Sequence, residues 1–403
     1  MQKSIIFINL GNFGSTGKIL RGIGELAEKN EYISYYVYPG GKNNYPKGKQ
    51  DIVLCSEFTK KINQKLSYIT GFNGCFSIIT TYRLLHKLDK IKPSIIHLHN
   101  LHNSYINLPI LFRYLSKHKT PVIWTLHDCW AFTGQCPHFT LERCDKWKTG
   151  CHDCPQYTNY PESIVDRTKI MWKLKKSWFT SVHNMTIVTP SQWLAGLVKQ
   201  SYLKDYPLKT INNGIDLSVF KPTSSDFRER FGLNKKYIVL GVAFGWGKRK
   251  GLDVFIDLAN KLDKSYQIVL VGTDDEIDKL LPNNILSIHR THNQTELAEI
   301  YSAADVFVNP TREEVLGLVN IESLACGTPV ITFNTGGSPE CIDENTGSVI
   351  DCDDIDAMQR EIIRICENKP FSSESCLKRA EKFDMSEKFK EYVRLYEDIT
   401  HST

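Results

Sequence analysis

Short apolar runs alternate along the chain with longer segments in which apolar residues recur every three to four positions. The short runs predict buried strands and the periodic segments predict helices. In the first half, strands are expected near Ile5–Leu10, Tyr35–Tyr38, Ser94–His99, Val122–Leu126 and Thr186–Thr189. In the second half, they are expected near Tyr237–Ala243, Ile268–Gly272, Ile285–His289, Asp305–Asn309 and Val330–Phe333. Because helical patterns such as Leu252–Leu262 and Thr295–Ala304 separate them, the sequence predicts an α/β protein with parallel sheets.

The length of 403 residues suits two domains of roughly 200 residues each. We place the N-terminal domain at residues 1–210 and the C-terminal domain at 211–384, joined at the turn-rich segment Asn212–Asp216. The remaining residues, 385–403, contain a charged amphipathic helix, Met385–Tyr396. No apolar run approaches the roughly 18 residues that would span a bilayer, and the first strand is too short for a signal peptide. These features predict a cytoplasmic protein.

Charge is distributed unevenly between the two halves. Residues 1–200 carry 26 Lys and Arg against 12 Asp and Glu, whereas residues 201–403 carry 24 against 33. A basic half suits an anionic partner such as phosphate, lipid headgroups or nucleic acid. Within it, Met171–Phe179 interleaves tryptophan with lysine, which favours the inner face of the plasma membrane over nucleic acid. A packed helix with one solvated face explains the same residues equally well.

The most informative segment is Asn309–Glu340. Glu314 and Glu322 lie eight positions apart on either side of Gly317, at an expected loop-to-helix junction. A second glycine loop, which begins at Gly336, follows one strand later. Backbone N–H groups at a helix start attract phosphate, and carboxylates beside them can accept hydrogen bonds from sugar hydroxyls. The segment therefore predicts a site for an anionic nucleotide attached to a neutral sugar.

This spacing resembles the signature of family 4 of the retaining glycosyltransferases: Glu, seven residues, Glu, a run ending Gly-Thr-Pro-Val, and Gly-Gly-x-x-Glu. The likeness extends over nearly the full length. It implies a GT-B architecture, in which two Rossmann-like domains with parallel sheets face each other across a cleft and a C-terminal helix crosses back to the first domain. It also implies sugar transfer from a nucleotide donor with retention at the anomeric carbon. In this fold, helix dipoles and cations neutralise the phosphates in place of a catalytic metal.

The resemblance also assigns roles to residues of the second domain. Glu314 would bind hydroxyls of the donor sugar, Glu322 the ribose hydroxyls, and the amides of Gly317 and Leu318 the donor at the helix start. This chain has Val315 where the family has a glycine.

A glycine-rich turn after the first strand of this domain supplies the cations. Lys250, in a Lys-Gly element that matches the family, would bind the donor diphosphate. The family usually has an arginine where Gly245 stands here, and Arg249 or Lys248 would replace it. The segment Asp351–Asp353 mimics the metal-binding Asp-x-Asp of other transferases, but we interpret it as a solvated loop.

In the first domain, the loop after the first strand fails the spacing of an ATPase phosphate loop, because Asn12 and Ile19 occupy positions that need glycine and Ser or Thr. It matches the family's flexible first loop, in which Gly14 and Ser15 would contact the donor diphosphate and acceptor.

His127 follows the strand Val122–Leu126, at the carboxyl edge where parallel sheets bind ligands. The family has a histidine here that positions the donor sugar. It is not assigned as a base, because in front-face attack the leaving phosphate oxygen takes the acceptor proton. His97, His99 and His102 would either line the acceptor side or be structural histidines with satisfied hydrogen bonds.

Five of the twelve cysteines lie close together, in an insertion at about residues 129–156. The last four, Cys136, Cys144, Cys151 and Cys154, have the spacing of a structural zinc site, although unmetallated thiols are the alternative. Four protein ligands would leave no open position for catalysis. A similar insertion is found in the subgroup of the family that builds bacterial surface polysaccharides, including colanic-acid-type enzymes.

These observations predict a retaining, metal-independent glycosyltransferase for surface polysaccharide synthesis. It would use a UDP-, GDP- or ADP-sugar as donor and a glycan or polyprenyl-pyrophosphate-linked saccharide as acceptor. It would be a peripheral protein at an anionic membrane surface, and no nucleic-acid partner is expected. The alternatives are a sugar-nucleotide epimerase of the same fold and a non-catalytic sugar-nucleotide-binding protein.

Overall fold

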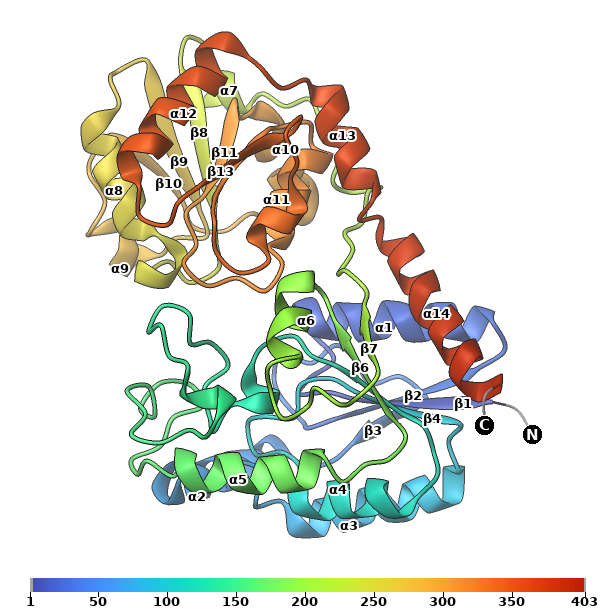
Figure 1. Ribbon diagram of the computed structural model, residues 1–403. Coiled ribbons are helices and arrows are strands. Elements are labelled where there is room, and N and C mark those ends of the chain that lie inside the picture. The colour runs from blue at the N-terminus through green and yellow to red at the C-terminus, as the bar shows by residue number, and fades with distance from the viewer. Residues whose placement is uncertain (1–2, 402–403) are drawn as a thin grey trace. The chain divides into compact units, whose positions relative to one another are not determined.

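A computed structural model describes residues 3–401 (Figure 1). The chain divides into two compact units. Unit 1 extends to Ile211 and includes the C-terminal segment from Phe389 onward, and unit 2 covers Asn212–Lys388.

Unit 1 is built on a parallel sheet of seven strands, within the described residues, in the order β3-β2-β1-β4-β5-β6-β7. Its strands are β1 (Ser4–Ile8), β2 (Ile33–Tyr38), β3 (Asp51–Val53), β4 (Ile95–Leu98), β5 (Val122–Thr125), β6 (Met185–Thr189) and β7 (Leu208–Thr210). Its helices are α1 (Gly14–Lys29), α2 (Glu57–Thr70), α3 (Ile78–Ile91), α4 (Leu108–Lys117), α5 (Thr168–Phe179), α6 (Gln192–Val198) and most of α14 (Met385–His401). Figure 1 shows α3, α4 and α5 on one face of the sheet and α1 and α14 on the other.

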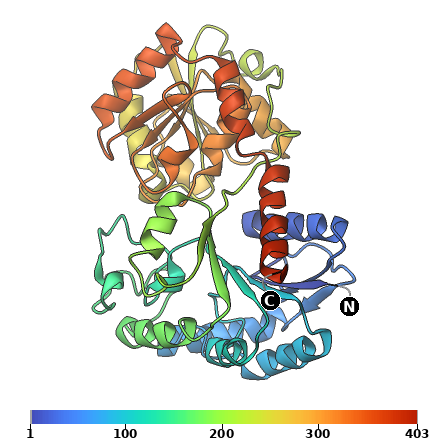
Figure 2. The same ribbon diagram turned by 45° about the vertical axis from the view of Figure 1, so that its right-hand side comes forward.

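Unit 2 is built on a parallel sheet of six strands, again counted over the described part of the chain, in the order β10-β9-β8-β11-β12-β13. The strands are β8 (Tyr237–Val242), β9 (Tyr266–Val271), β10 (Ile285–Ile288), β11 (Val306–Asn309), β12 (Val330–Phe333) and β13 (Gly347–Ile350). The helices are α7 (Phe227–Arg230), α8 (Leu252–Lys261), α9 (Asp275–Asp278), α10 (Gln294–Ala303), α11 (Leu318–Ala325), α12 (Ile355–Asn368) and α13 (Ser373–Glu381). As Figure 2 also shows, helices cover both faces of this sheet.

Each sheet face in unit 2 has its own apolar core. Phe227, Tyr301 and Leu324 belong to the core formed with α7, α10 and α11, and Phe255 and Met358 to the core formed with α8 and α12. The central strands are therefore buried on both sides, which explains why they read as continuous apolar runs in the sequence. The prediction of two α/β domains with parallel sheets is confirmed.

The strands that the hydrophobic pattern did not predict are all at sheet edges. β3, β7 and β13 have three or four residues each, and all three include exposed or half-buried positions. An edge strand needs few apolar residues, because one of its sides meets solvent instead of a neighbouring strand.

Helix α14 is attached to unit 1 by two buried tyrosines and one close packing contact. The Tyr396 hydroxyl lies 2.7 Å from Nδ1 of buried His97, and the Tyr392 hydroxyl lies 3.2 Å from Oγ1 of Thr125. The Phe389 ring packs against Gly22 of α1. A Cβ atom at position 22 would lie only 2.1 Å from this ring. A larger residue at position 22 would therefore have to displace the Phe389 ring.

Replacing Tyr396 by phenylalanine should destabilise unit 1, because it leaves Nδ1 of buried His97 without its partner. We expect the Y396F variant to lose roughly 1–3 kcal/mol, which lowers the thermal midpoint by roughly 2–10 °C. Six of the seven tryptophans lie in unit 1, so intrinsic fluorescence reports its unfolding. The variant Y82F, at an exposed tyrosine, is the control, and equal midpoints for the two variants would contradict the assignment.

Candidate functional site

The strand order of unit 2 reverses between β8 and β11. These strands are neighbours in the sheet, β9 and β10 extend it to one side, and β12 and β13 extend it to the other. In open parallel sheets, ligands bind outside the carboxyl ends of the strands at this switch point. The loop from residue 244 to 251 follows β8, and the loop from 310 to 317 follows β11. The predicted lysine and the first predicted glutamate lie in these two loops.

The structure brings Lys250 and Glu314 together. The Lys250 Nζ atom lies 2.7 Å from Oε2 of Glu314, and the side chains are 17% and 21% exposed. Gly251 has a φ of 76°, and a Cβ there would be 2.4 Å from the carbonyl oxygen of Pro310. The two loops therefore approach more closely than any other residue at position 251 would allow.

Two further glycines shape the backbone around Glu314. Gly317 has a φ of 88° and immediately precedes α11. Gly336, in the loop after β12, has a φ of 59°, and a Cβ there would be 1.7 Å from the Glu314 carbonyl oxygen. The next residue, Gly337, donates its N–H to the same oxygen at 3.1 Å. The second glycine loop thus holds Glu314 beside the N-terminal end of α11, where the helix dipole favours an anion.

Three further predicted donor-site residues lie on α11 and in the loop after β8. Glu322, on α11, accepts a hydrogen bond of 3.1 Å from the buried Tyr301 hydroxyl, and Leu318 is half-buried at the start of that helix. Arg249 is also half-buried, and its carbonyl accepts the backbone N–H of Arg312 at 2.9 Å.

The sequence interpretation overlooked Arg312, which ties the β8 loop to its surroundings. The buried guanidinium donates to both carboxylate oxygens of Asp253 at 2.8 Å, to Asp353 at 2.7 Å and to the Lys248 carbonyl. Burial alone would lower the pKa of Arg312, but the two carboxylates raise it above its usual value. Residues 351–353 are exposed, as expected for a solvated loop, and Asp353 also forms an ion pair with Arg312.

A buried polar network joins the ends of β11 and β12 to α11. The Asn309 amide donates to Asn320 Oδ1 at 2.8 Å, and the Asn320 amide donates to the Ser338 hydroxyl at 2.8 Å. The Ser338 hydroxyl lies 2.7 Å from the Thr332 hydroxyl, and the Thr332 hydroxyl donates to the Asn309 carbonyl at 3.1 Å. The signal for this network in the sequence was Asn309 at the end of an apolar strand, because a buried side-chain amide needs hydrogen-bond partners.

Gly14, Ser15 and His127 belong to unit 1. Gly14 is the first residue of α1 and has a φ of 69°, and Ser15 is exposed. The order of the sheet in unit 1 reverses between β1 and β4, so the loop that leads to Gly14 follows a strand at that reversal. His127 follows β5, the neighbour of β4, at the same edge.

His127 belongs to a column of histidines. Its Nε2 lies 2.9 Å from Nδ1 of His99, with the two rings stacked at 5.2 Å between centroids, and the His99 and His97 rings are 4.2 Å apart. Burial lowers the pKa of His127 to about 4 and that of His97 to about 3, and it lowers the pKa of His99 well below its usual value. Neutral His127 therefore suits hydrogen bonding better than proton donation.

The structure also decides between the alternatives for His97. His97 is fully buried, with Tyr396 on Nδ1 and Thr125 Oγ1 at 2.8 Å from Nε2. His102 lies between the Tyr160 hydroxyl, 2.8 Å from its Nδ1, and Asp128, 3.3 Å from its Nε2. His97 is thus a structural histidine with satisfied hydrogen bonds.

The cysteine-rich insertion consists of turns and short 3-10 helices, and within residues 3–401 none of the twelve cysteines forms a disulfide bond. Cys136 and Cys154 share a hydrogen bond, which lowers the pKa of Cys154, and the Gly134 N–H donates to Cys151 Sγ at 3.1 Å. Among residues 3–401, no group of three or more His, Cys, Asp or Glu side chains is arranged to hold a metal ion.

Helix α5, which carries the interleaved tryptophans and lysines, is a packed helix. Trp172 and Phe179 are buried, and Lys175 is fully buried, with its ammonium 3.7 Å from the centre of the Trp130 ring. Burial lowers the pKa of Lys175 to about 7. This burial fits the packed-helix alternative, and the membrane interpretation of this segment stays a prediction. No helix in the described range 3–401 combines the length and apolar character needed to cross a bilayer.

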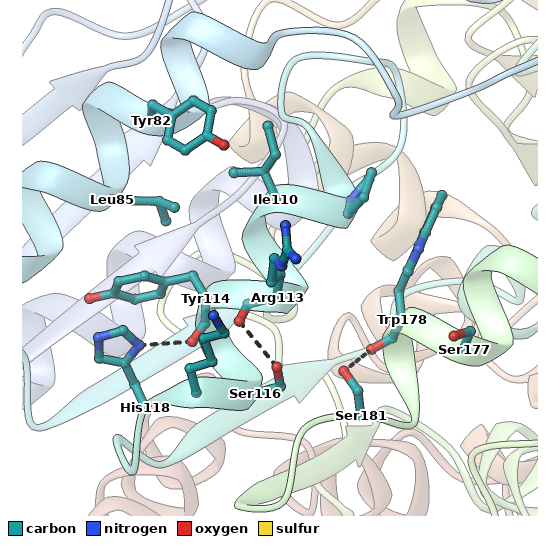
Figure 3. A pocket seen from close by; sticks show the side chains of 12 residues that line it. Tyr82, Leu85, Ile110, Arg113, Tyr114, Ser116, His118, Ser177, Trp178 and Ser181 are labelled. Atoms are coloured by element: carbon teal, nitrogen blue, oxygen red, sulfur yellow. Dashed lines mark hydrogen bonds between the residues drawn. The ribbon is translucent and has the colours of Figure 1, made fainter.

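A separate pocket of about 520 Å³ lies among α3, α4 and α5 (Figure 3). Tyr82, Ile110 and Trp178 provide aromatic and apolar walls, and Arg113 and Lys117 provide positive charge. It involves none of the predicted site residues.

Comparison with known proteins identifies two family domains. Residues 59–219 match the model described as Glycosyltransferase Family 4, and residues 224–384 match Glycosyl transferases group 1. The chain is 26% identical over 363 residues to the "Putative colanic acid biosynthesis glycosyl transferase WcaC" of Escherichia coli (strain K12), with 85% of each chain covered. The second matched segment contains Lys250, Glu314 and Glu322.

Solved structures share the fold over the full length. Sucrose-phosphate synthase from Thermosynechococcus elongatus has a TM-score of 0.73 at 18% identity, with 100% of both chains covered. Anabaena Alr3699/HepE in complex with UDP-glucose has a TM-score of 0.67 at 14% identity, with 98% of this chain and 99% of that chain covered. The two Rossmann-like units therefore form a fold of the GT-B type.

The histidine column should make the stability of unit 1 depend on pH. The unfolded histidines bind protons below about 6.5, whereas the buried ones stay neutral until about 4 or lower. Stability is therefore complete above about pH 6.5 and falls as pH decreases, by at most about 1.4 kcal/mol per pH unit for each histidine.

Urea unfolding followed by tryptophan fluorescence at pH 7, 6 and 5 measures this slope. The H97Q variant should show a shallower slope than wild type, whatever its absolute stability. The matched control is H118Q, which removes an exposed histidine. Identical slopes for wild type and H97Q would refute the neutral-histidine assignment.

Proposed function

We propose that this chain, a glycosyltransferase of the GT-B type, transfers a sugar from a nucleotide-diphosphate donor to a glycan or lipid-linked saccharide acceptor. The transfer would retain the anomeric configuration and serve the synthesis of a bacterial surface polysaccharide. The observation that carries the proposal is the Lys250–Glu314 pair at the switch point of unit 2. Relatives support the substrate class, because one is named for colanic acid biosynthesis and a neighbour in fold was solved with UDP-glucose.

Lys250 would bind the donor diphosphate. Its ammonium is paired with Glu314 at 2.7 Å, and a diphosphate carries more negative charge than one carboxylate. Binding would therefore draw Lys250 toward the phosphates and release Glu314 for hydroxyl groups of the donor sugar. Arg249 is the candidate for the second cation. The amides of Gly317 and Leu318 would add the dipole of α11.

The other roles follow the same chemistry. Glu322 would accept hydrogen bonds from the ribose hydroxyls, oriented by its bond to Tyr301. In unit 1, Gly14 and Ser15 would contact the diphosphate and acceptor, and His127 would position the donor sugar through a hydrogen bond as a neutral imidazole. As the anomeric carbon–oxygen bond to the diphosphate breaks, the acceptor oxygen bonds to the same face, and its proton passes to the leaving phosphate oxygen. No step in this scheme needs a catalytic metal.

Replacing Lys250 by alanine should reduce kcat/KM by roughly 10²–10³-fold, because phosphate charge is no longer neutralised as the leaving group departs. E314Q should cause a comparable loss. The control K264A removes an exposed lysine of the same unit and should keep wild-type activity. Donors are chosen by thermal shift among UDP-, GDP- and ADP-sugars, and product configuration is determined by NMR. Wild-type activity of E314Q would reject the proposed role of Glu314. A product with inverted anomeric configuration would reject the retaining mechanism.

The same assay separates the alternatives. An epimerase would change the sugar nucleotide without an acceptor, so incubation with donor alone should leave the configuration of the donor sugar unaltered. A non-catalytic binding protein would bind the donor without turnover in the presence of any acceptor.

Zinc at Cys136, Cys144, Cys151 and Cys154 stays a prediction. Burial is the main cause of the raised pKa of the Cys151 thiol, and the nearby Cys154 and Cys144 thiols raise it further, so these three side chains lie near one another. We expect about one zinc per chain by elemental analysis. The C151S/C154S double variant should lose the metal and become less stable, whereas C352S, at an exposed cysteine outside the insertion, should retain it. Purified wild type without zinc, with a thermal midpoint indifferent to chelator, would show the prediction to be wrong.

A further inference from the structure

Helix α2 has its polar side turned inward and its apolar side turned outward. Its buried residues are Asn63 and Ser67, whereas Phe58 is 73% exposed and Ile62 is 45% exposed. Leu66 and Ile69 are exposed as well, and the spacing of these four residues places them along one side of the helix. A surface helix of a water-soluble domain normally has the opposite arrangement.

Hydrogen bonds explain the polar inner side. The Asn63 amide donates to the Ser77 hydroxyl at 2.6 Å, and the Ser67 hydroxyl lies 2.6 Å from that of Ser104. The first contact places the middle of α2 beside the start of α3. Ile78 and Ile79 follow Ser77 directly and are 52% and 68% exposed. We call Phe58, Ile62, Leu66, Ile69, Ile78 and Ile79 the α2–α3 face.

Positive charges accompany this face. Lys60, Lys61 and Lys65 lie on α2, and Arg83, Lys87 and Lys90 lie on α3. Only Glu57 and Asp89 oppose them on these two helices, and Glu57 pairs with Lys61 at 3.1 Å. Lysine side chains can extend along an apolar surface and keep their ammonium groups at its polar boundary.

We propose that the α2–α3 face docks on the surface of an anionic phospholipid bilayer. Outward apolar side chains would enter the boundary between headgroups and acyl chains, and the surrounding cations would meet the lipid phosphates. A second copy of the chain is a poorer occupant. A symmetric dimer would place the same patch against itself, so that lysines would face lysines.

A polar pocket at the same helix fits this orientation. It has a volume of about 490 Å³, and its lining includes Lys65 and Tyr68 of α2 together with Asn103 and Tyr160. Polar groups beside an inserted apolar face would lie at headgroup depth. The surface would bring the proposed transferase to a membrane-borne acceptor, but docking requires no sugar transfer. Each proposal can therefore fail without the other.

Vesicle co-sedimentation of the full chain tests the docking face. Wild type should bind vesicles that contain phosphatidylglycerol in phosphatidylcholine more tightly than pure phosphatidylcholine, and added salt should weaken binding. The triple variant F58S/I62S/I69S should bind at least about tenfold more weakly. The K61Q/K65Q variant should bind anionic vesicles roughly 30-fold more weakly, without a change in its binding to pure phosphatidylcholine.

The matched control is L280S/V349S, which removes two exposed apolar side chains from unit 2 and should bind as wild type does. Thermal unfolding establishes that every variant is folded. Because the changed positions are exposed, the variants should keep wild-type midpoints. Unchanged vesicle binding by the folded triple variant would overturn the proposal. So would a dimer in sedimentation velocity that dissociates in the triple variant, since the face would then be an interface between copies.

Discussion

The candidate site depends on how closely three loops approach one another at the carboxyl ends of β8, β11 and β12. Side chains at positions 251 and 336 would collide with the carbonyls of Pro310 and Glu314, so only glycine permits this arrangement. The approach places Lys250 against Glu314 beside the start of α11. A cation, a carboxylate and a helix dipole thereby share one small volume, which is the combination that a charged leaving group attached to a neutral sugar requires.

Rigidity around this volume comes from groups that do no chemistry in the proposed reaction. Arg312 connects Asp253 with Asp353, and Asn309 and Asn320 connect a strand end with a helix. These buried polar groups have satisfied hydrogen bonds, so they favour one loop arrangement over others. In unit 1, the histidine column has a comparable role, because burial keeps its rings neutral while α14 supplies the hydroxyl that His97 needs.

Two helices of unit 1 show why composition alone misleads. Helix α5 interleaves tryptophan with lysine, yet Trp172, Phe179 and Lys175 are all buried. Helix α2 has less conspicuous residues, but its isoleucines face outward because its asparagine and serine bond inward. Hydrophobic periodicity predicts that a helix is amphipathic and leaves open which side is buried. That choice follows from the partners available to the polar side.

The sequence by itself determined the α/β class, the two parallel sheets and the central strands, because strands buried on both faces must be apolar throughout. It also determined which residue types lie in the glycine loops, since the Glu-x7-Glu and Gly-Gly spacings are local. The tertiary structure decided the short edge strands, which carry little apolar signal, and the pairing of Lys250 with Glu314 across 64 positions of the chain. It also decided that Arg312 pairs with Asp353, that Trp172 and Phe179 of α5 are buried, and that the apolar side of α2 is exposed. Such contacts depend on which elements become neighbours, and local periodicity does not encode that.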